Sequence, residues 1–127
     1  MFQGLRTLIL HVHELQAAKA WYTAALGIQP YYDTPYYGGY DVAGYELGLH
    51  PMAKDEKPQG SRAVAYWGVA DVAAAVAHLV QHGATVSEAP KDVGGGIVVG
   101  AVTDPFGNQF AVIYNPQFTG QAQTPPA

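Results

Sequence analysis

The sequence predicts an α+β fold made of two βαβββ modules, one in each half of the chain. The first observation is an internal repeat, because the same order of segments occurs twice within the 127 residues. The second is that each half holds an apolar strand, an Ala-rich helix that ends at a glycine, and a closing turn followed by an alternating strand. We therefore expect one domain over residues 1–116, with module one at about residues 5–51, module two at about residues 62–116, and a flexible C-terminal tail at residues 117–127.

The first half begins with an apolar strand around residues 8–12. An Ala-rich helix follows and ends at Gly27, because glycine readily adopts the left-handed conformation that closes a helix. A turn at residues 41–44 then leads into an alternating strand at residues 45–50. These segments account for the first module.

The second half repeats this order, with a strand around residues 65–69 and an Ala-rich helix that ends at Gly83. Residues 84–88 form the next strand. The glycines at residues 94–96 indicate a turn and not a phosphate loop, since no Lys-Ser/Thr pair and no helix follow them. A turn at residues 104–107 precedes the last strand, as in the first half.

Composition excludes several classes of function. The net charge is −4 with only six Lys and Arg residues, so we expect no binding to nucleic acid or to an anionic membrane. The chain has no cysteine, which excludes disulfides, thiolate metal sites and a cysteine nucleophile. It has neither a signal peptide nor an apolar run long enough to span a membrane, and we expect a cytoplasmic protein.

Alternation along the strands predicts which side chains share the face of each sheet that lies away from the helix. In the first half this face carries Thr7, Ile9, His11, His13, Glu46, Gly48 and His50. In the second half it carries Val64, Tyr66, Gly68, Gln109, Ala111 and Ile113. Polar groups are therefore concentrated on the first module, and the second is far more apolar.

The chain resembles the vicinal oxygen chelate superfamily, which includes glyoxalase I, extradiol dioxygenases and bleomycin resistance proteins. The segments that carry the resemblance are HVHELQAAKAWYTAALG (11–27), YELGLHP (45–51), WGVADVAAAVAHLVQHGATV (67–86) and DPFGNQFAVIYNP (104–116). The resemblance implies curled mixed sheets that form a cleft, completed in a homodimer. It also implies that enzymes of this family bind a divalent metal there through His, Gln and Glu.

The metal-binding positions of that family do not carry metal ligands in this sequence. The first-strand positions correspond to Thr7 and Val64, and the last-strand positions to Ala111 and Gly48, with Glu46 one step away along the same face. A catalytic metal normally needs about three carboxylate or imidazole ligands. We therefore expect no metal of the family type and no other cofactor.

A second group, His11, Glu46 and His50, is expected on the polar face together with His13, and three interpretations remain open. The imidazoles and the carboxylate are candidate catalytic groups for acid/base chemistry in a cofactor-free lyase or isomerase. Alternatively, His11, Glu46 and His50 form a relocated metal site of a lyase or dioxygenase. In the third interpretation these groups bond only to one another, to backbone or to water.

Six tyrosines lie between residues 31 and 45, and tyrosine rings suit an aromatic or heterocyclic ligand. Alternating tyrosines are equally typical of strands, of a core or of a dimer interface. The leading hypothesis is a protein that binds or sequesters a small organic molecule without metal; whether it is an enzyme remains open. The expected ligand-binding residues are Thr7, Ile9, Tyr37, Tyr40, Val64, Tyr66, Gln109 and Ala111.

Overall fold

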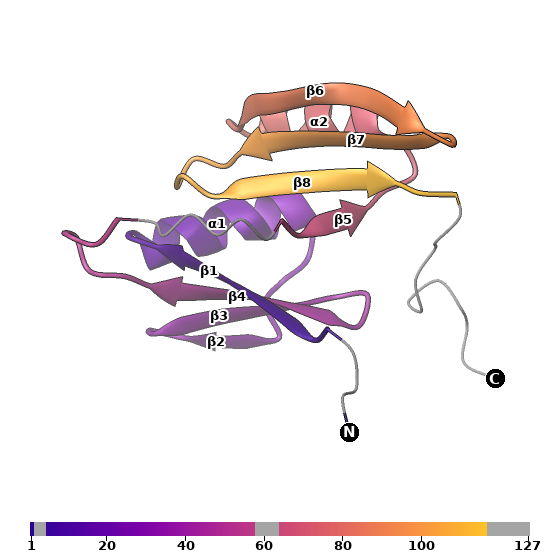
Figure 1. The fold of residues 1–127 in the computed structure, drawn as a ribbon. Coiled ribbons are helices and arrows are strands. Elements are labelled where there is room, and N and C mark those ends of the chain that lie inside the picture. Colours follow the sequence, from indigo (N-terminus) through magenta and orange to yellow (C-terminus); the bar gives the residue numbers. More distant parts are fainter. Residues whose placement is uncertain (2–4, 58–63, 117–127) are drawn as a thin grey trace. The chain divides into compact units, whose positions relative to one another are not determined.

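The computed structural model describes residue 1 and residues 5–57 and 64–116, and it confirms the α+β fold class. Within these residues the chain forms two four-stranded mixed sheets, each accompanied by a helix (Figure 1). The chain divides into two compact units, Met1–Gln59 and Gly60–Ala127, and the boundary falls between the two predicted modules. The predicted tail, residues 117–127, lies outside the described residues.

The first unit contains β1 (Thr7–Val12), α1 (Leu15–Leu26), β2 (Tyr32–Thr34), β3 (Tyr37–Val42) and β4 (Tyr45–Pro51). The strand order is β1-β4-β3-β2, with β1 parallel to β4 and the other neighbours antiparallel. The helix ends as the sequence predicts, because Gly27 has a left-handed φ of 71° and its N–H donates to the Thr23 carbonyl.

The core of the first unit lies on the helix side of this sheet. Its fully buried side chains include Val12, Tyr22, Tyr40, Leu47 and Leu49. Tyr40 pairs with Leu47 across the β3–β4 ladder, and its hydroxyl donates to the Lys19 carbonyl of α1 at 2.9 Å. The expectation that Tyr40 binds a ligand is therefore corrected: it faces the helix and belongs to the core.

Lys19 is a buried cation on α1, with only 6% of the residue exposed. Its Nζ donates to Oδ1 of Asp33 at 2.6 Å and to the Thr34 carbonyl at 2.5 Å, both on the edge strand β2. The side-chain stem crosses Gly38, where an added Cβ would lie 3.1 Å from Cε of Lys19. Lys19 thus ties α1 to the edge of the sheet.

The second unit contains β5 (Tyr66–Gly68), α2 (Val72–Gln81), β6 (Thr85–Gly94), β7 (Ile97–Thr103) and β8 (Gln109–Tyr114), in the order β5-β8-β7-β6. Val72, Val76 and Leu79 form the buried face of α2. Val72 and Val76 lie directly over Gly100, where an added Cβ would be 3.0 and 3.1 Å from their methyl groups. The predicted glycine turn at residues 94–96 is confirmed between β6 and β7.

No helix in the described part of the chain is long and apolar enough to cross a membrane.

Candidate functional site

The polar face of the first sheet is arranged as strand alternation predicts. In β4, Leu47 and Leu49 are fully buried on the helix side, while Glu46 is half-buried and His50 is exposed. In β1, Thr7, Ile9 and His11 are exposed, and they pair with Glu46, Gly48 and His50 respectively. Tyr37 of β3 is half-buried on the same face. Its ring lies over Gly48, where an added Cβ would meet it.

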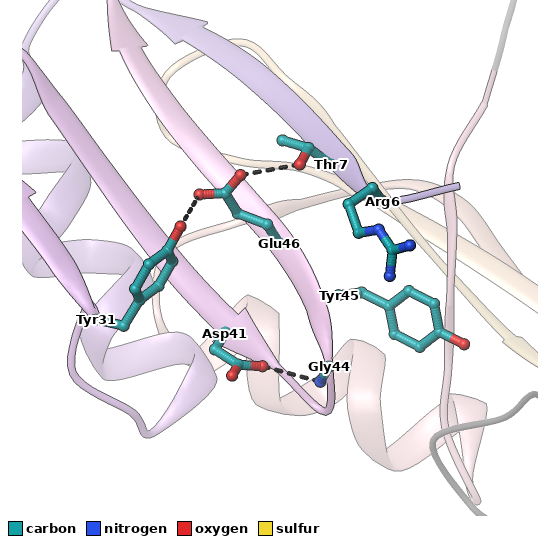
Figure 2. A pocket seen from close by; sticks show the side chains of 7 residues that line it. All are labelled: Arg6, Thr7, Tyr31, Asp41, Gly44, Tyr45 and Glu46. Atoms are coloured by element: carbon teal, nitrogen blue, oxygen red, sulfur yellow. Dashed lines mark hydrogen bonds between the residues drawn. The ribbon is translucent and has the colours of Figure 1, made fainter. Parts of the chain in front are cut away.

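Glu46 is the centre of this face, because hydroxyl groups from three side chains converge on its carboxylate. The Thr7 hydroxyl donates to Oε1 at 2.9 Å, and the Tyr31 hydroxyl donates to Oε2 at 2.5 Å (Figure 2). The Tyr37 hydroxyl is a further donor to this carboxylate. All three partners are neutral, so the carboxylate is held in place without losing its negative charge.

These contacts set the protonation states of the group. The bond from Tyr31 contributes most to lowering the pKa of Glu46 below its usual 4.5; partial burial acts in the opposite direction, and the bonds from Thr7 and Tyr37 add to the lowering. Burial, followed by the bond to Glu46, raises the pKa of Tyr37 to about 12. The bond to Glu46 also raises the pKa of Tyr31 above 10.0. Near neutral pH, Glu46 is therefore an anion and both phenols are donors.

Two glycines leave the space that the tyrosines need. Gly39 and Gly48 are partners across the β3–β4 ladder. A Cβ at Gly48 would lie 2.8 Å from Cζ of Tyr37, and a Cβ at Gly39 would lie 2.9 Å from Oε2 of Glu46 and 3.0 Å from the rings of Tyr31 and Tyr37. A Cβ at either position would force these side chains to shift, so the two glycines leave the space in which the rings lie over the sheet and reach Glu46.

A pocket of about 240 Å³ lies beside Glu46, entirely within the first unit. Its lining is formed by Arg6, Thr7, Tyr31, Asp41, Gly44, Tyr45 and Glu46 (Figure 2). Asp41 pairs with Glu46 across the ladder, and its Oδ1 accepts the Gly44 N–H at 2.8 Å. This bond closes a hairpin turn in which both Ala43 and Gly44 have positive φ, as a type I′ turn requires.

The predicted catalytic set is only partly brought together. His11 and His50 are register partners, with ring centroids 5.5 Å apart, and Nδ1 of His50 lies 2.8 Å from the Pro51 carbonyl. Glu46 precedes His50 by four residues on β4, which corresponds to about 13 Å along a strand. The carboxylate is thus remote from both imidazoles, and the proposed orientation of a catalytic histidine by Glu46 does not hold.

The same distance rules out a single metal ion bound by His11, Glu46 and His50. Within residues 5–57 and 64–116, no three His, Asp or Glu side chains are grouped closely enough to hold a metal. At the positions that correspond to the family ligands, Val64 and Ala111 have no donor atom, and Thr7 supplies a hydroxyl that already binds Glu46. The residues present therefore do not fit the family-type metal.

In the second unit, the predicted ligand-binding residues are exposed with one exception. Val64, Tyr66 and Gln109 lie at the surface, and Tyr66 pairs with Ala111 across the β5–β8 ladder. Ala111 is only 1% exposed and offers almost no surface to a ligand.

Sequence reasoning missed Arg6, Asp41 and the contact of Tyr31 with Glu46. Tyr31 and Arg6 lie just outside the strands, so alternation gave no information on where their side chains point. A signal for Asp41 was available, because Asp-x-x-Gly before a strand is typical of a side chain that caps a hairpin turn.

Comparisons with known proteins agree with this fold. Residues 4–112 match the family model described as the Glyoxalase/Bleomycin resistance protein/Dioxygenase superfamily. A glyoxalase-related enzyme from Fulvimarina pelagi is 22% identical, with a TM-score of 0.74 over 91% of this chain and 90% of that one. A superfamily member from Sphaerobacter thermophilus is 20% identical, with a TM-score of 0.73 over 90% and 98% of the two chains.

A family enzyme from Burkholderia phytofirmans is 19% identical, with a TM-score of 0.72 over 85% of this chain and 95% of that one. No curated protein matches the chain. At these identities the solved structures support the fold, and the chemistry has to be argued from the side chains described above.

Proposed function

This chain belongs to the glyoxalase/bleomycin resistance protein/dioxygenase superfamily, and we propose that it binds a small aromatic or heterocyclic molecule without metal, in the pocket beside Glu46. Binding or sequestration is the function that this site supports best. The observation that carries the proposal is an ionised carboxylate, held by neutral hydroxyl groups, at the edge of a pocket lined by tyrosine rings.

The tyrosines supply the apolar surface that an aromatic ligand needs. Tyr31 is 63% exposed and Tyr45 is 44% exposed, and both line the pocket. An aromatic pair contributes about 0.5–1.5 kcal/mol beyond the buried area. Neighbouring rings extend this surface, since the centroids of Tyr31 and Tyr32 are 6.3 Å apart.

The polar groups supply orientation. The Glu46 carboxylate has about four lone-pair directions, of which Thr7, Tyr31 and Tyr37 engage three, so one direction remains for a donor on the ligand. Because the hydroxyl donors fix the carboxylate before any ligand arrives, binding does not have to order it. A rigid acceptor beside aromatic rings is the usual composition of a small-molecule site.

The test is isothermal titration of the full-length protein with a panel of monocyclic aromatic and heterocyclic compounds, in buffer with EDTA. For compounds that bind, Tyr31→Ala and Tyr45→Ala should weaken binding about tenfold each, the equivalent of about 1.4 kcal/mol. Tyr36→Ala is the matched control, because Tyr36 is 76% exposed and does not line the pocket. Equal affinity in all variants, or binding that EDTA abolishes, would overturn the proposal.

We also propose that the protein is a homodimer, as the family resemblance implies, and that it acts in the cytoplasm. Light scattering after size-exclusion chromatography gives the mass directly. A mass equal to one chain at micromolar concentration would contradict this.

A further inference from the structure

Two histidines on the first sheet form a second candidate site, separate from the pocket. We propose that His11 and His50 together bind one divalent transition-metal ion of the kind that imidazole prefers, such as Zn²⁺, Ni²⁺ or Cu²⁺. His50 follows Glu46 by four residues on β4, or about 13 Å along the strand. Metal binding at this pair is therefore independent of the ligand proposed above.

The sheet brings the two side chains together from distant parts of the sequence. His11 and His50 are register partners on the parallel strands β1 and β4, which lie side by side (Figure 1), and both residues are exposed. Their ring centroids are 5.5 Å apart, and the ring planes are tilted by 59°. Two imidazoles on one zinc ion have centres about 5 Å apart, because each zinc–nitrogen bond is about 2.0–2.1 Å long and the angle at the metal is near tetrahedral. The observed spacing is close to the spacing that chelation requires.

His50 is oriented in the way that is usual for a metal-binding histidine. Its Nδ1 lies 2.8 Å from the Pro51 carbonyl, and since a carbonyl oxygen only accepts, Nδ1 carries the hydrogen. In the neutral ring Nε2 then has the lone pair that coordination needs. Metal-bound histidines commonly donate their other N–H to a backbone carbonyl, which fixes the tautomer and the ring orientation. Coordination by His11 likewise uses only one of its two ring nitrogens.

The number and type of ligands limit what this site can do. Imidazole nitrogens favour Zn²⁺, Ni²⁺ and Cu²⁺ over Mg²⁺ and Ca²⁺, which prefer oxygen ligands. In the part of the chain that the structure describes, no third His, Asp or Glu side chain joins the pair closely enough to share a metal. The remaining coordination positions are left to water or to a small chelating molecule. Catalytic zinc normally has three protein ligands, so the pair is suited to reversible metal binding and not to hydrolysis.

A second pair of histidines has to be separated from this one in a test. His78 and His82 lie one turn apart at the end of α2, with ring centroids 4.5 Å apart. Two histidines at this helical spacing can also bind a metal ion. Because they are close in the sequence, they can meet in the unfolded chain as well, whereas His11 and His50 meet only in the folded sheet. Metal binding by His11 and His50 should therefore stabilise the folded state.

The test is titration calorimetry with NiCl₂ at pH 8 on the full-length His78→Ala protein without an affinity tag. In this background one equivalent of Ni²⁺ should bind, whereas Mg²⁺ should not. Adding His11→Ala or His50→Ala should weaken Ni²⁺ binding at least tenfold. His13→Ala is the matched control, because it removes an exposed imidazole two residues from His11 and should leave the affinity unchanged.

Urea unfolding gives a second readout on the same proteins. All the substituted residues are exposed, so the variants should fold. Increasing Ni²⁺ should raise the midpoint of unfolding in the His78→Ala protein and in its His13→Ala derivative, but not in the His11→Ala or His50→Ala derivatives. A metal that binds folded and unfolded chains equally would leave every midpoint unchanged.

Three outcomes would overturn the proposal. Absence of Ni²⁺ binding in the His78→Ala protein would mean that the two rings only contact each other. Affinity that persists without His11 or His50, or that falls equally without His13, would place the metal elsewhere. Binding with no change in the unfolding midpoint would show that the folded sheet does not form the site.

Discussion

Replacing Lys19 by methionine would test how strongly a buried ion pair stabilises the sheet beneath the site. Only 8% of the Lys19 side chain is exposed, whereas 58% of the Asp33 side chain is exposed. Without the ammonium group, Asp33 can rehydrate, so the main loss is two charge-assisted hydrogen bonds. The ammonium also no longer has to be desolvated, which offsets part of this loss. We expect Lys19→Met to lower the free energy of unfolding by about 1–2 kcal/mol.

Lys19→Ala should cost more, because it also removes the stem that covers Gly38. Three methylene groups are lost, and burial of each contributes about 0.8 kcal/mol. Adding about 2 kcal/mol to the loss of the ion pair gives about 3–4 kcal/mol in total. The difference between the two variants therefore measures the stem, and the difference between methionine and wild type measures the charge.

Urea unfolding followed by circular dichroism gives the three free energies, provided that the slopes are equal. A Lys19→Met protein as stable as the wild type would show that the ion pair contributes nothing, as happens for some buried pairs. Equal stability of the methionine and alanine variants would refute the packing argument. Asp33→Asn is the matched variant for the partner, and it should cost more than Lys19→Met, because it leaves the buried Lys19 ammonium without its carboxylate.

Three further predictions concern the site and its scaffold. Gly48→Ala should lower the free energy of unfolding, measured by urea denaturation, by about 1–3 kcal/mol, because the new methyl group meets the ring of Tyr37. Gly68→Ala is the control: no atom lies within 4 Å of its new methyl group, so it should change this free energy by less than about 0.5 kcal/mol. The pKa of Glu46 is lowered in the folded state, so its contribution to stability is fully present above the unfolded pKa near 4.5 and is lost as the pH falls through the folded pKa. The free energy of unfolding, measured from pH 3 to pH 6, should therefore fall less steeply toward acid pH in Glu46→Gln than in the wild type. Asp71→Ala should cost about 1 kcal/mol, because the carboxylate caps α2, while Glu14→Ala at the start of α1 should be nearly neutral, because its side chain makes no cap bond.

Each of these has an outcome that would contradict it. Equal effects of Gly48→Ala and Gly68→Ala would mean that the tyrosine above β4 moves aside freely. An unchanged acid limb in Glu46→Gln would show that the hydroxyl bonds do not act on the ionised form. An Asp71→Ala protein as stable as the wild type would show that packing, and not this cap, stabilises α2.

The fold was predictable because its signals are local. Alternation in β4 separates Leu47 and Leu49 from Glu46 without reference to any other part of the chain. The internal repeat then predicts the second unit from the first. Helix ends follow from backbone preference, as the left-handed Gly27 shows.

The site was only partly predictable, because residues on the same face of a sheet can lie far apart along it. Glu46 and His50 project from the same side of β4, yet four residues of a strand separate them by about 13 Å. Tyr37 and Tyr40 look alike in the sequence, but they are three residues apart on one strand and so face opposite sides. Tyr31 precedes β2, and the direction of its ring depends on the path of the chain and on the space left by Gly39.

The repeat also shows why the chemistry gathers in one unit. In the first sheet, one row across β1, β4 and β3 carries Thr7, Glu46 and Asp41. The repeat places Gln109 of β8 at the position of Glu46, and Gln109 pairs with Thr103 of β7. The second sheet therefore has an amide and a hydroxyl group where the first has two carboxylates, and the first sheet keeps the charge that a ligand can recognise. The proposed recognition of a ligand through Glu46 and the tyrosines depends on this difference between the two sheets.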